Sequence, residues 1–588
     1  MLKWIRLSLA ALATSFVAAC GGGDEPPFTI ADVTATDGRF TTLNQALVNT
    51  GLQATLLQSG TFTVFAPTDD AFNALATELG VTRAQLLADR ALLTSVLQYH
   101  VLNTRVPQAS VPLGRAITPL AGGVFKVESA AGGLVITDGR NRTSRITQTD
   151  VGTTNGVIHV VDRVLLPANR NIVQTAQSLP QFSILVEAVV AANLQGALSG
   201  SGPLTVFAPT NDAFAALLSE LGLTKEQLLA DTELLTRVLT YHVLPARVLK
   251  ADIVPGTPVT TLQGGTFTVG NDLAITDSRN RRAGITATDV FASNGVVHVI
   301  DRVILPLPAT NIVQVAQSLP QFSILVEAVV AAGLVDALSG TGPLTVFAPT
   351  NDAFAALLAE LGITKEALLA DRELLTRVLT YHVVPGRVLR AQVPVGSAIT
   401  TLQGGTFTVG NDLAITDSRN RRAGITATDV FASNGVVHVI DRVILPLPAT
   451  NIVQVAQSLP QFSILVEAVV AAGLVDALSG TGPLTVFAPT NDAFAALLAE
   501  LGVTKEALLA NRELLTQVLT YHVVPGRVLR AQVPVGTPIT TLQGESFTVN
   551  ASLAITDQRS RSANIVATDV FASNGVVHVL DRVILPRP

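Results

Sequence analysis

The eight histidines and four tyrosines of this 588-residue chain recur at matching positions, and their side chains are suited to acid–base, metal or contact chemistry. An imidazole titrates near neutral pH and binds metal ions, so a recurring histidine is the first candidate for a site. Four histidines directly follow a tyrosine, in the pairs Tyr99-His100, Tyr241-His242, Tyr381-His382 and Tyr521-His522. The other four are His159, His298, His438 and His578.

Two histidines, a tyrosine and an aspartate in one unit could build a metal site of imidazole and carboxylate ligands. The two histidines of a unit lie 56 to 59 residues apart, however, and no short ligand spacing supports such a site. The sequence also lacks the G-x-S-x-G, G-x-x-x-x-G-K and H-E-x-x-H patterns. We therefore predict no metal, no cofactor and no enzymatic activity. A serine–histidine arrangement assembled from distant residues remains as an alternative.

The Tyr-His pairs close strongly apolar segments of the sequence. An aromatic ring and an imidazole in such a place pack the core more often than they face a partner. The ring N–H would then be bonded to a carbonyl, or to an oxygen of Thr350 or Asp352. His298, His438 and His578 lie in V-V-H-V strands that are apolar on both faces, which also predicts core packing. Asp441 and Arg442 alternate along the same strand, so we expect each to meet a partner elsewhere, such as Arg387 or Asp352.

The histidines belong to a unit that occurs four times. The string T-V-F-A-P-T-N-D-A-F begins at Thr205 and returns at Thr345 and Thr485, and a related string begins at Thr63. Residues 260–362 and 400–502 are identical. A unit of about 135 residues is near the commonest size of an independently folding domain. We therefore expect four tandem domains, at 28–167, 171–306, 311–446 and 451–586, joined by short proline-containing connectors.

The elements expected in the third unit change from helical to extended along the chain. Helical spacing and caps predict helices within 322–338 and at 353–361, 365–370 and 373–383. β-branched runs between glycine, asparagine and aspartate turns predict strands at 344–348, 399–409, 413–416, 424–430 and 436–445. Helices clustered first and strands afterward predict an α+β domain with a mostly antiparallel sheet, closed by an N-terminal strand.

Three ordered motifs carry a resemblance to a known family. The V-F-A-P-T-N-D-A-F segment, the Tyr-His pair and the N-G-V-V-H-V-I-D-R-V-I-L-P ending resemble the signature boxes and central Tyr-His of the fasciclin (FAS1) domain. The resemblance implies a β wedge or sandwich flanked by helices, and members that are secreted or surface-anchored and act in adhesion, matrix contact and host association. It also implies a contact role for the Tyr-His region, beside the core role favoured above.

The N-terminus has the features of an export signal. Lys3 and Arg6 precede an apolar run and a small-residue region, which predicts a signal peptide over 1–19. Cys20, the one cysteine of the chain, lies where the lipobox of bacterial lipoproteins has its acylated cysteine, and 20–27 then forms a linker. The alternative is an ordinary signal peptide with an incidental cysteine. A lipid anchor would hold the protein on the cell membrane or the outer membrane, facing the periplasm or the cell exterior.

Composition narrows the class of partner. The net charge of −6 and the absence of a run rich in lysine or arginine predict no binding to nucleic acid. We expect a surface-anchored, multivalent adhesion protein that contacts extracellular matrix, a cell surface, or a polysaccharide or protein ligand. A carrier of a small apolar ligand or pigment is the alternative, and a hydrolytic enzyme is a third possibility.

Overall fold

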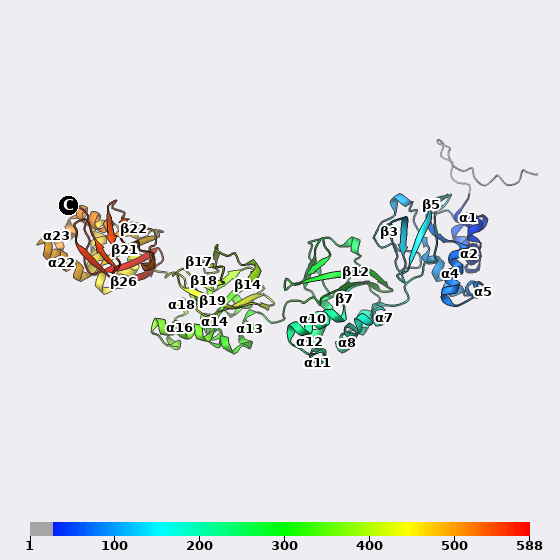
Figure 1. Ribbon diagram of the computed structural model, residues 1–588, viewed down its shortest axis with the longest axis horizontal. Helices are drawn as coiled ribbons and strands as arrows, with labels where there is room; N and C mark the ends of the chain where they lie inside the picture. Colours follow the sequence, from blue (N-terminus) through cyan, green and yellow to red (C-terminus); the bar gives the residue numbers. More distant parts are fainter. Residues whose placement is uncertain (1–27) are drawn as a thin grey trace, which may run out of the picture. The chain divides into compact units, whose positions relative to one another are not determined.

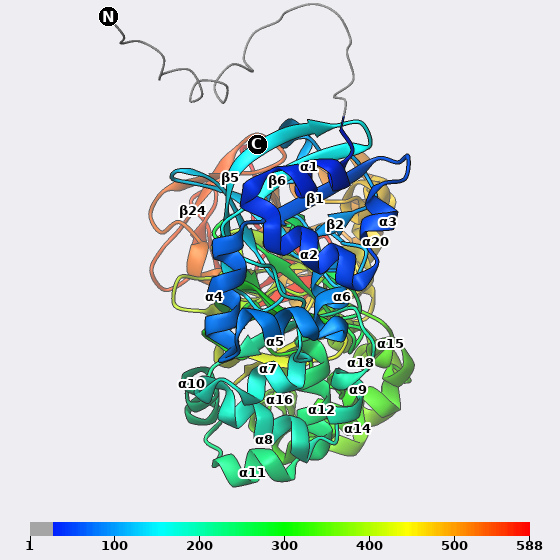
Figure 2. The same cartoon turned by 90° about the vertical axis from the view of Figure 1, so that its right-hand side faces the viewer.

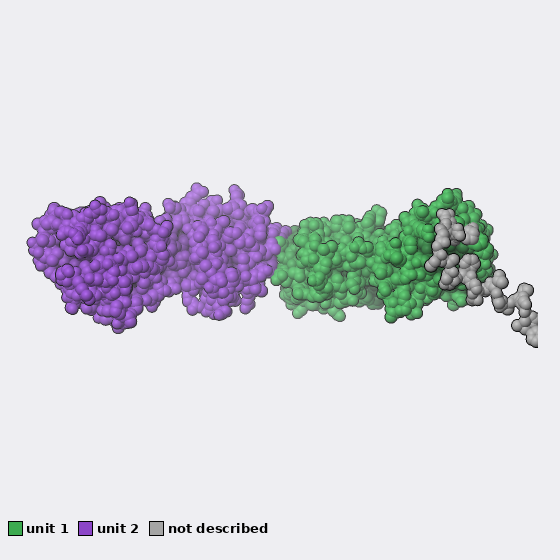
Figure 3. Space-filling view, turned by 90° about the horizontal axis from the view of Figure 1, so that it is seen from above, with its two compact units in different colours: residues 1–307 green, residues 308–588 purple. Residues whose placement is uncertain are grey.

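A computed structural model describes residues 28–588, and the predicted signal peptide, Cys20 and linker lie outside the described residues. The chain divides into two compact units, Met1–Leu307 and Pro308–Pro588, and each unit contains two repeats (Figure 3). Every repeat has one mixed sheet and a group of helices. The fold is therefore α+β, as the order of helical and extended segments predicted.

The third repeat shows the order of elements. Its helices are α13 (Ile312–Ser318), η5 (Pro320–Phe322), α14 (Ser323–Ala332), α15 (Val335–Ser339), α16 (Asn351–Leu361), α17 (Lys365–Ala370), α18 (Arg372–Tyr381) and η6 (Arg390–Gln392). Its strands are β14 (Leu344–Pro349), β15 (Val383–Pro385), β16 (Ala398–Thr400), β17 (Thr406–Val409), β18 (Ala414–Thr416), β19 (Arg422–Ala432) and β20 (Gly435–Ile440).

The other repeats follow the same order. The first contains α1 (Ile30–Thr36), α2 (Thr41–Thr50), α3 (Gln53–Leu56), β1 (Phe62–Pro67), α4 (Asp69–Leu79), α5 (Arg83–Ala88), α6 (Arg90–Tyr99), β2 (Val101–Leu102), β3 (Lys126–Ala130), β4 (Gly133–Thr137), β5 (Thr143–Thr153) and β6 (Gly156–Val161). The second contains α7 (Ile172–Gln177), α8 (Ser183–Ala191), α9 (Gln195–Ser199), β7 (Leu204–Pro209), α10 (Asn211–Leu221), α11 (Lys225–Ala230), α12 (Thr232–Tyr241), β8 (Val243–Leu244), β9 (Val259–Thr260), β10 (Thr266–Val269), β11 (Ala274–Thr276), β12 (Arg282–Ala292) and β13 (Gly295–Ile300). The fourth contains α19 (Ile452–Gln457), α20 (Ser463–Ala472), α21 (Val475–Ser479), β21 (Leu484–Pro489), α22 (Asn491–Leu501), α23 (Lys505–Ala510), α24 (Arg512–Tyr521), β22 (Val523–Pro525), η8 (Arg530–Gln532), β23 (Pro538–Thr540), β24 (Ser546–Val549), β25 (Ala554–Thr556), β26 (Ser562–Ala572) and β27 (Gly575–Leu580).

The sheet of the third repeat has the strand order β15-β14-β20-β19-β18-β17-β16. Its one parallel pair is β14 with β20, in which Phe347 lies opposite His438. The other pairs are antiparallel. The expected closure of a mostly antiparallel sheet by the early strand is thus confirmed.

Two cores cover the two faces of this sheet, because side chains alternate along a strand. Val346 and Val437 point into the core shared with the helices. Phe347 and Ile440 point into a second core, made with Tyr381 and strands β16–β19. The same division occurs in each repeat. Figure 1 shows the helices of the second repeat gathered on one side of its strands, and Figure 2 faces the helices of the first repeat.

Three boundaries differ from the expected ones. The strand expected over 436–445 ends at Ile440, where its pairing with β14 ends at Pro349. The helix expected at 373–383 ends at Tyr381, because Val383 pairs with Val346 in the sheet. The run expected as one strand over 399–409 is two strands, because a turn closes between Thr401 and Gly405, with Gly404 at φ +96°. Periodicity alone does not reveal this turn, since β-prone threonines, Thr400 and Thr406, flank it on both sides.

Among residues 28–588, no single helix is both long and apolar enough to cross a membrane. The helices Ile312–Ser318 and Pro320–Ala332 reach the length and apolar composition of a membrane span only when they are taken together, and the chain bends by 113° where they join.

Candidate functional site

Each Tyr-His pair lies at the end of an apolar helix, at the border between the two cores. Tyr381 ends α18 and is fully buried, and His382, at the C-cap, is 2% exposed. The pairs of the other three repeats have the same location and are no more exposed. All eight side chains named as candidate binding residues are therefore inside the protein.

Both ring nitrogens of His382 are bonded to backbone. Nδ1 lies 2.7 Å from the carbonyl oxygen of Val378, and Nε2 accepts a hydrogen bond from the Ile444 N–H at 3.1 Å. Since the carbonyl only accepts and the amide only donates, the ring is neutral with its proton on Nδ1. Burial lowers the pKa of His382 to about 4, and the pKa values of His100, His242 and His522 are lowered equally. The Thr350 and Asp352 oxygens suggested as partners are not used.

The tyrosine hydroxyls anchor the strand side of the sheet. Tyr381 donates to the carbonyl of Thr406 at 2.6 Å and is 2.8 Å from the Ser418 hydroxyl. Burial raises the pKa of Tyr381 to about 12. The ring also packs edge-on against Phe407, with 6.1 Å between the ring centres. The Tyr381-His382 pair thus ties α18 to β17 through the tyrosine and to the segment after β20 through the histidine.

The second histidine of each unit packs in the core, as predicted. His438 is fully buried and contacts the Phe347 ring at 5.3 Å between centres. Its Nε2 bonds to the Val388 carbonyl oxygen at 2.9 Å, and its Nδ1 accepts from the Asp429 N–H at 3.3 Å. Within residues 28–588 no three His, Cys, Asp or Glu side chains gather as metal ligands would.

Two buried polar residues outside the candidate site make more hydrogen bonds than the histidines do. Asn434 accepts from the Ile312 N–H at 2.9 Å and donates to the carbonyls of Leu338 and Gly340 at 2.8 Å. It joins the start of the repeat to its last strand. Its signal in the sequence is the S-N-G turn before V-V-H-V, repeated in the last three units.

Asp417 is the second of these residues. It accepts hydrogen bonds from the N–H groups of Arg419, Arg421 and Leu445, each at 2.9 Å. The D-S-R-N-R string around it was visible in the sequence.

The partners expected for Asp441 and Arg442 were wrong. Asp441 accepts from the Gly424 N–H at 2.6 Å, and Arg442 pairs with Glu360 at 3.1 Å. The long Arg442 side chain reaches the end of the neighbouring helix α16, which a strand pattern does not indicate.

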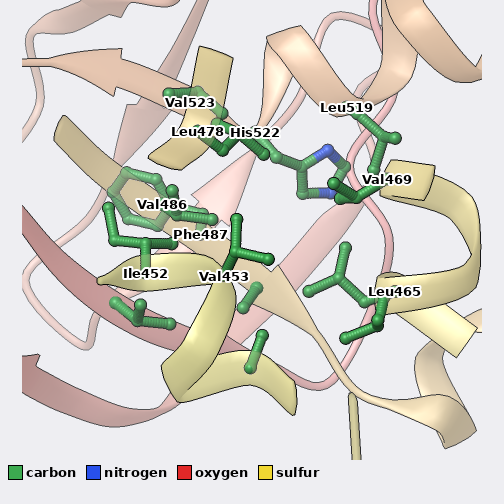
Figure 4. A pocket seen from close by; sticks show the side chains of 14 residues that line it. Ile452, Val453, Leu465, Val469, Leu478, Val486, Phe487, Leu519, His522 and Val523 are labelled. Carbon is green, nitrogen blue, oxygen red and sulfur yellow. The ribbon is translucent and has the colours of Figure 1, made fainter. Parts of the chain in front are cut away.

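An apolar cavity lies between the helices and the sheet of the fourth repeat (Figure 4). It has a volume of about 30 Å³, and its lining includes Val453, Val466 and Phe487, with the ring of His522 as its one side chain that carries polar atoms. The second repeat has the corresponding cavity, lined by Val173 and Val186. Because both ring nitrogens of His522 are bonded to backbone, the cavity offers a ligand apolar contact only.

Comparison with known proteins identifies the repeats. The fasciclin domain model matches residues 38–167, 180–306, 320–446 and 460–586. Transforming growth factor-beta-induced protein ig-h3 of Sus scrofa is 30% identical over 534 residues, which is 90% of this chain and 73% of that protein. Human periostin is 27% identical over 537 residues, 90% of this chain and 60% of that protein.

Among solved structures, a FAS1 domain pair from the insect cell adhesion molecule fasciclin I aligns with 46% of this chain and 97% of its own length, at 19% identity and a TM-score of 0.24. Together with the four family matches, the repeated fold places this chain in the fasciclin domain family, with four fasciclin domains in tandem.

Proposed function

We propose that this protein is a surface-anchored, multivalent adhesion protein. The observation that supports this function best is the repetition itself: four domains of one fold each have a helix-side core and a strand-side core of their own. Each domain therefore presents its own copy of a similar surface. Two linked weak sites can gain a factor of about 10² to 10⁴ in overall binding where geometry permits.

The partner of such an array would be a matrix protein, a cell surface, or a polysaccharide or protein ligand. The adhesive and matrix roles that the fasciclin resemblance implies favour this class of partner. The Tyr-His pairs would act indirectly in this binding. They are buried and bonded to backbone, and in the third repeat the pair positions β17 and the chain after β20. A direct contact role for them stays a prediction.

The experiment compares the whole chain with the excised fourth domain on surfaces coated with matrix proteins or polysaccharides. At equal domain concentration the four-domain chain should dissociate at least about tenfold more slowly. Equal dissociation would remove the case for multivalency.

The anchor is a separate proposal. We propose that Cys20 is acylated after removal of residues 1–19, so that the exported protein is held on the cell membrane or outer membrane. Labelling of growing cells with an alkyne fatty acid should tag the wild-type chain and leave Cys20→Ser unlabelled. An unlabelled wild-type chain would contradict the anchor and leave the adhesion proposal standing.

A carrier of a small apolar ligand is the second candidate. The apolar cavities of the second and fourth repeats mark where such a ligand would lie, but at about 30 Å³ each would have to open to the several hundred Å³ of a small-molecule site. A purified chain that carried a pigment would absorb in the visible, where the protein itself does not. A hydrolytic enzyme has less support, because both ring nitrogens of the histidines in the Tyr-His pairs are bonded to backbone.

A further inference from the structure

A polar cleft lies within the second unit, where the third and fourth repeats meet. It has a volume of about 850 Å³, within the range of small-molecule binding sites. The third repeat contributes residues of the turn and strand 403–408 and of the loop 416–420. The fourth contributes Arg527, Leu529, Gln532 and Ser573. We call this contact between repeats the 3–4 seam, and the corresponding contact in the first unit the 1–2 seam.

The cleft has one uncompensated charge. Its lining contains two ionisable residues, Asp417 and Arg527. Asp417 accepts hydrogen bonds from three backbone N–H groups of its own repeat, and its charge is balanced by Arg421, whose Nη1 lies 3.9 Å from its Oδ2. Arg527 has no ion pair and no side-chain hydrogen bond within residues 28–588, and its Nε is buried without a partner. The cleft is therefore locally cationic, although the chain as a whole is acidic.

The rest of the lining offers unused hydrogen-bonding groups. The hydroxyls of Thr406, Thr408 and Thr416 and the amide of Asn420 line the cleft, and none of them is hydrogen-bonded in the described part of the chain. These neutral groups both donate and accept. Together with a guanidinium, they suit a ligand that has many hydroxyls and a carboxylate.

At the 1–2 seam the corresponding positions are bridged by side chains of the two repeats. Lys126 follows the buried Phe125 as Thr408 follows the buried Phe407. The Lys126 Nζ is 2.9 Å from Asp289 of the second repeat and 3.0 Å from Glu128, and its side chain is 7% exposed. A threonine at this place cannot reach across the seam.

A second difference concerns Asn420, which lies in the turn between β18 and β19. Asn141, the counterpart of Asn420, donates to the Phe291 carbonyl at 3.1 Å and accepts from the Phe291 N–H at 2.6 Å across the 1–2 seam. Arg247, the counterpart of Arg527, also has a buried Nε without a partner. The unpaired Nε is thus common to both seams, and the cleft with its unbonded groups distinguishes the 3–4 seam.

From this contrast we infer that the cleft at the 3–4 seam binds an acidic oligosaccharide, with a uronate carboxylate on the Arg527 guanidinium. The planar guanidinium pairs with a carboxylate through two parallel hydrogen bonds. The threonine hydroxyls and the Asn420 amide bind the sugar hydroxyls. The inference rests on the proposed adhesion function, since it names the chemical class of one partner.

The test is calorimetric titration of the full chain with an oligomer of four galacturonate units. We expect saturable binding at one site per chain. The methyl ester of the same oligomer, which lacks the negative charge, should bind at least about tenfold more weakly, and so should inorganic sulfate, which lacks the sugar hydroxyls. No saturable binding of the uronate oligomer, or equal binding of the ester, would overturn the inference.

Matched variants locate the site. Arg527→Gln should weaken binding by about tenfold or more. Arg527→Lys should weaken it less, because lysine keeps the positive charge but cannot form the two parallel hydrogen bonds of a guanidinium. Thr408→Lys, which copies the residue of the closed seam, should abolish binding. Arg247→Gln, at the 1–2 seam, should bind like the wild type. Unchanged binding by Arg527→Gln, with urea midpoints equal to the wild type, would place the ligand elsewhere and refute the assignment.

Oligomer binding and multivalent adhesion can be tested separately, because a short oligomer binds one site on one chain and gains nothing from the number of domains. A chain that adheres to surfaces but does not bind the oligomer refutes the cleft alone. A chain that binds the oligomer, yet gains nothing from four domains on a surface, refutes multivalent adhesion alone.

Discussion

Acidification should destabilise every repeat through its buried Tyr-His histidine. Burial lowers the pKa of His100, His242, His382 and His522 to about 4, from 6.5 in an unfolded chain. Between these two values the unfolded state binds a proton that the folded state does not. The free energy of unfolding therefore falls as pH falls from about 6.5 toward 4.

The size of the effect follows from the two pKa values. One such histidine removes about 2 kcal/mol of stability per repeat between pH 7 and pH 5. His298, His438 and His578, whose pKa values burial also lowers, act in the same direction. Asp277 and Asp417 change the stability in the opposite direction. Burial raises their pKa values above 3.8, so the folded state binds their protons more tightly than the unfolded state does, and the free energy of unfolding rises as pH falls through those values.

Urea unfolding followed by tyrosine fluorescence measures this effect, because each repeat has one tyrosine and all four are buried. With a slope of about 2 kcal/mol per molar urea, the midpoint should be about 1 M lower at pH 5 than at pH 7. His522→Asn removes the titrating ring from the fourth repeat. The share of the signal from Tyr521 should then have a lower midpoint at pH 7 and a smaller shift between pH 7 and pH 5, with His578 as the remaining buried histidine of that repeat. Midpoints that agree within about 0.3 M at the two pH values would refute the reasoning.

Three further outcomes follow from particular contacts. Lys126→Thr leaves the buried Asp289, whose side chain is 1% exposed, without its cation, so the free energy of unfolding of the first two repeats in urea should fall by about 3 kcal/mol. The double variant Lys126→Thr/Asp289→Asn should recover part of this loss, and no loss in the single variant would mean that the ion pair contributes nothing. Asn574→Ala removes buried hydrogen bonds of 2.9, 2.8 and 2.8 Å, and the fourth-repeat transition should lose about 3 kcal/mol, whereas a loss below about 1 kcal/mol would contradict the role given to this amide. Val466→Asn places the residue of the first repeat, Asn44, at the edge of the apolar cavity. If the protein carries an apolar ligand there, the variant should bind a fluorescent apolar dye more weakly; unchanged binding would mean that the dye does not bind in that cavity.

The fold followed from the sequence because its signals are local and repeat. Thr350 caps α16 through the Ala353 N–H, and Gly362 ends that helix at φ +66°; a capping threonine and a terminal glycine are both local signals. Strand β14 is apolar at every position except Thr345, which indicates burial on both faces. The alternation along such a strand does not say which face meets the helices. That assignment depends on Tyr381 and Phe407 meeting across a distance in the chain that periodicity does not span.

The candidate site was harder to predict for a physical reason. The chemistry of an imidazole depends on whether water reaches it, and burial of His382 is set by packing of α18 on the sheet rather than by its neighbours in sequence. The residue types of the Tyr-His pairs indicated either contact with a partner or packing in the core, and their burial favours packing in the core. Thr408 and Arg527 had no motif to mark them. They matter only because two repeats meet, and nothing in a single repeat encodes that contact.

Copies of one domain acquire different properties where they meet different neighbours, and this is where selection on a tandem array can act with least damage to the fold. Core positions such as Phe347 and Phe487 are fixed by the packing that all copies share. Position 126 and its counterpart 408 lie at the edge of that core, where lysine and threonine both leave the preceding phenylalanine in place. The lysine closes a seam by pairing with Asp289, and the threonine leaves a cleft beside Arg527. The residue at this position therefore helps to decide whether a seam is closed by an ion pair or left open, while the phenylalanine cores of the two domains keep the same packing.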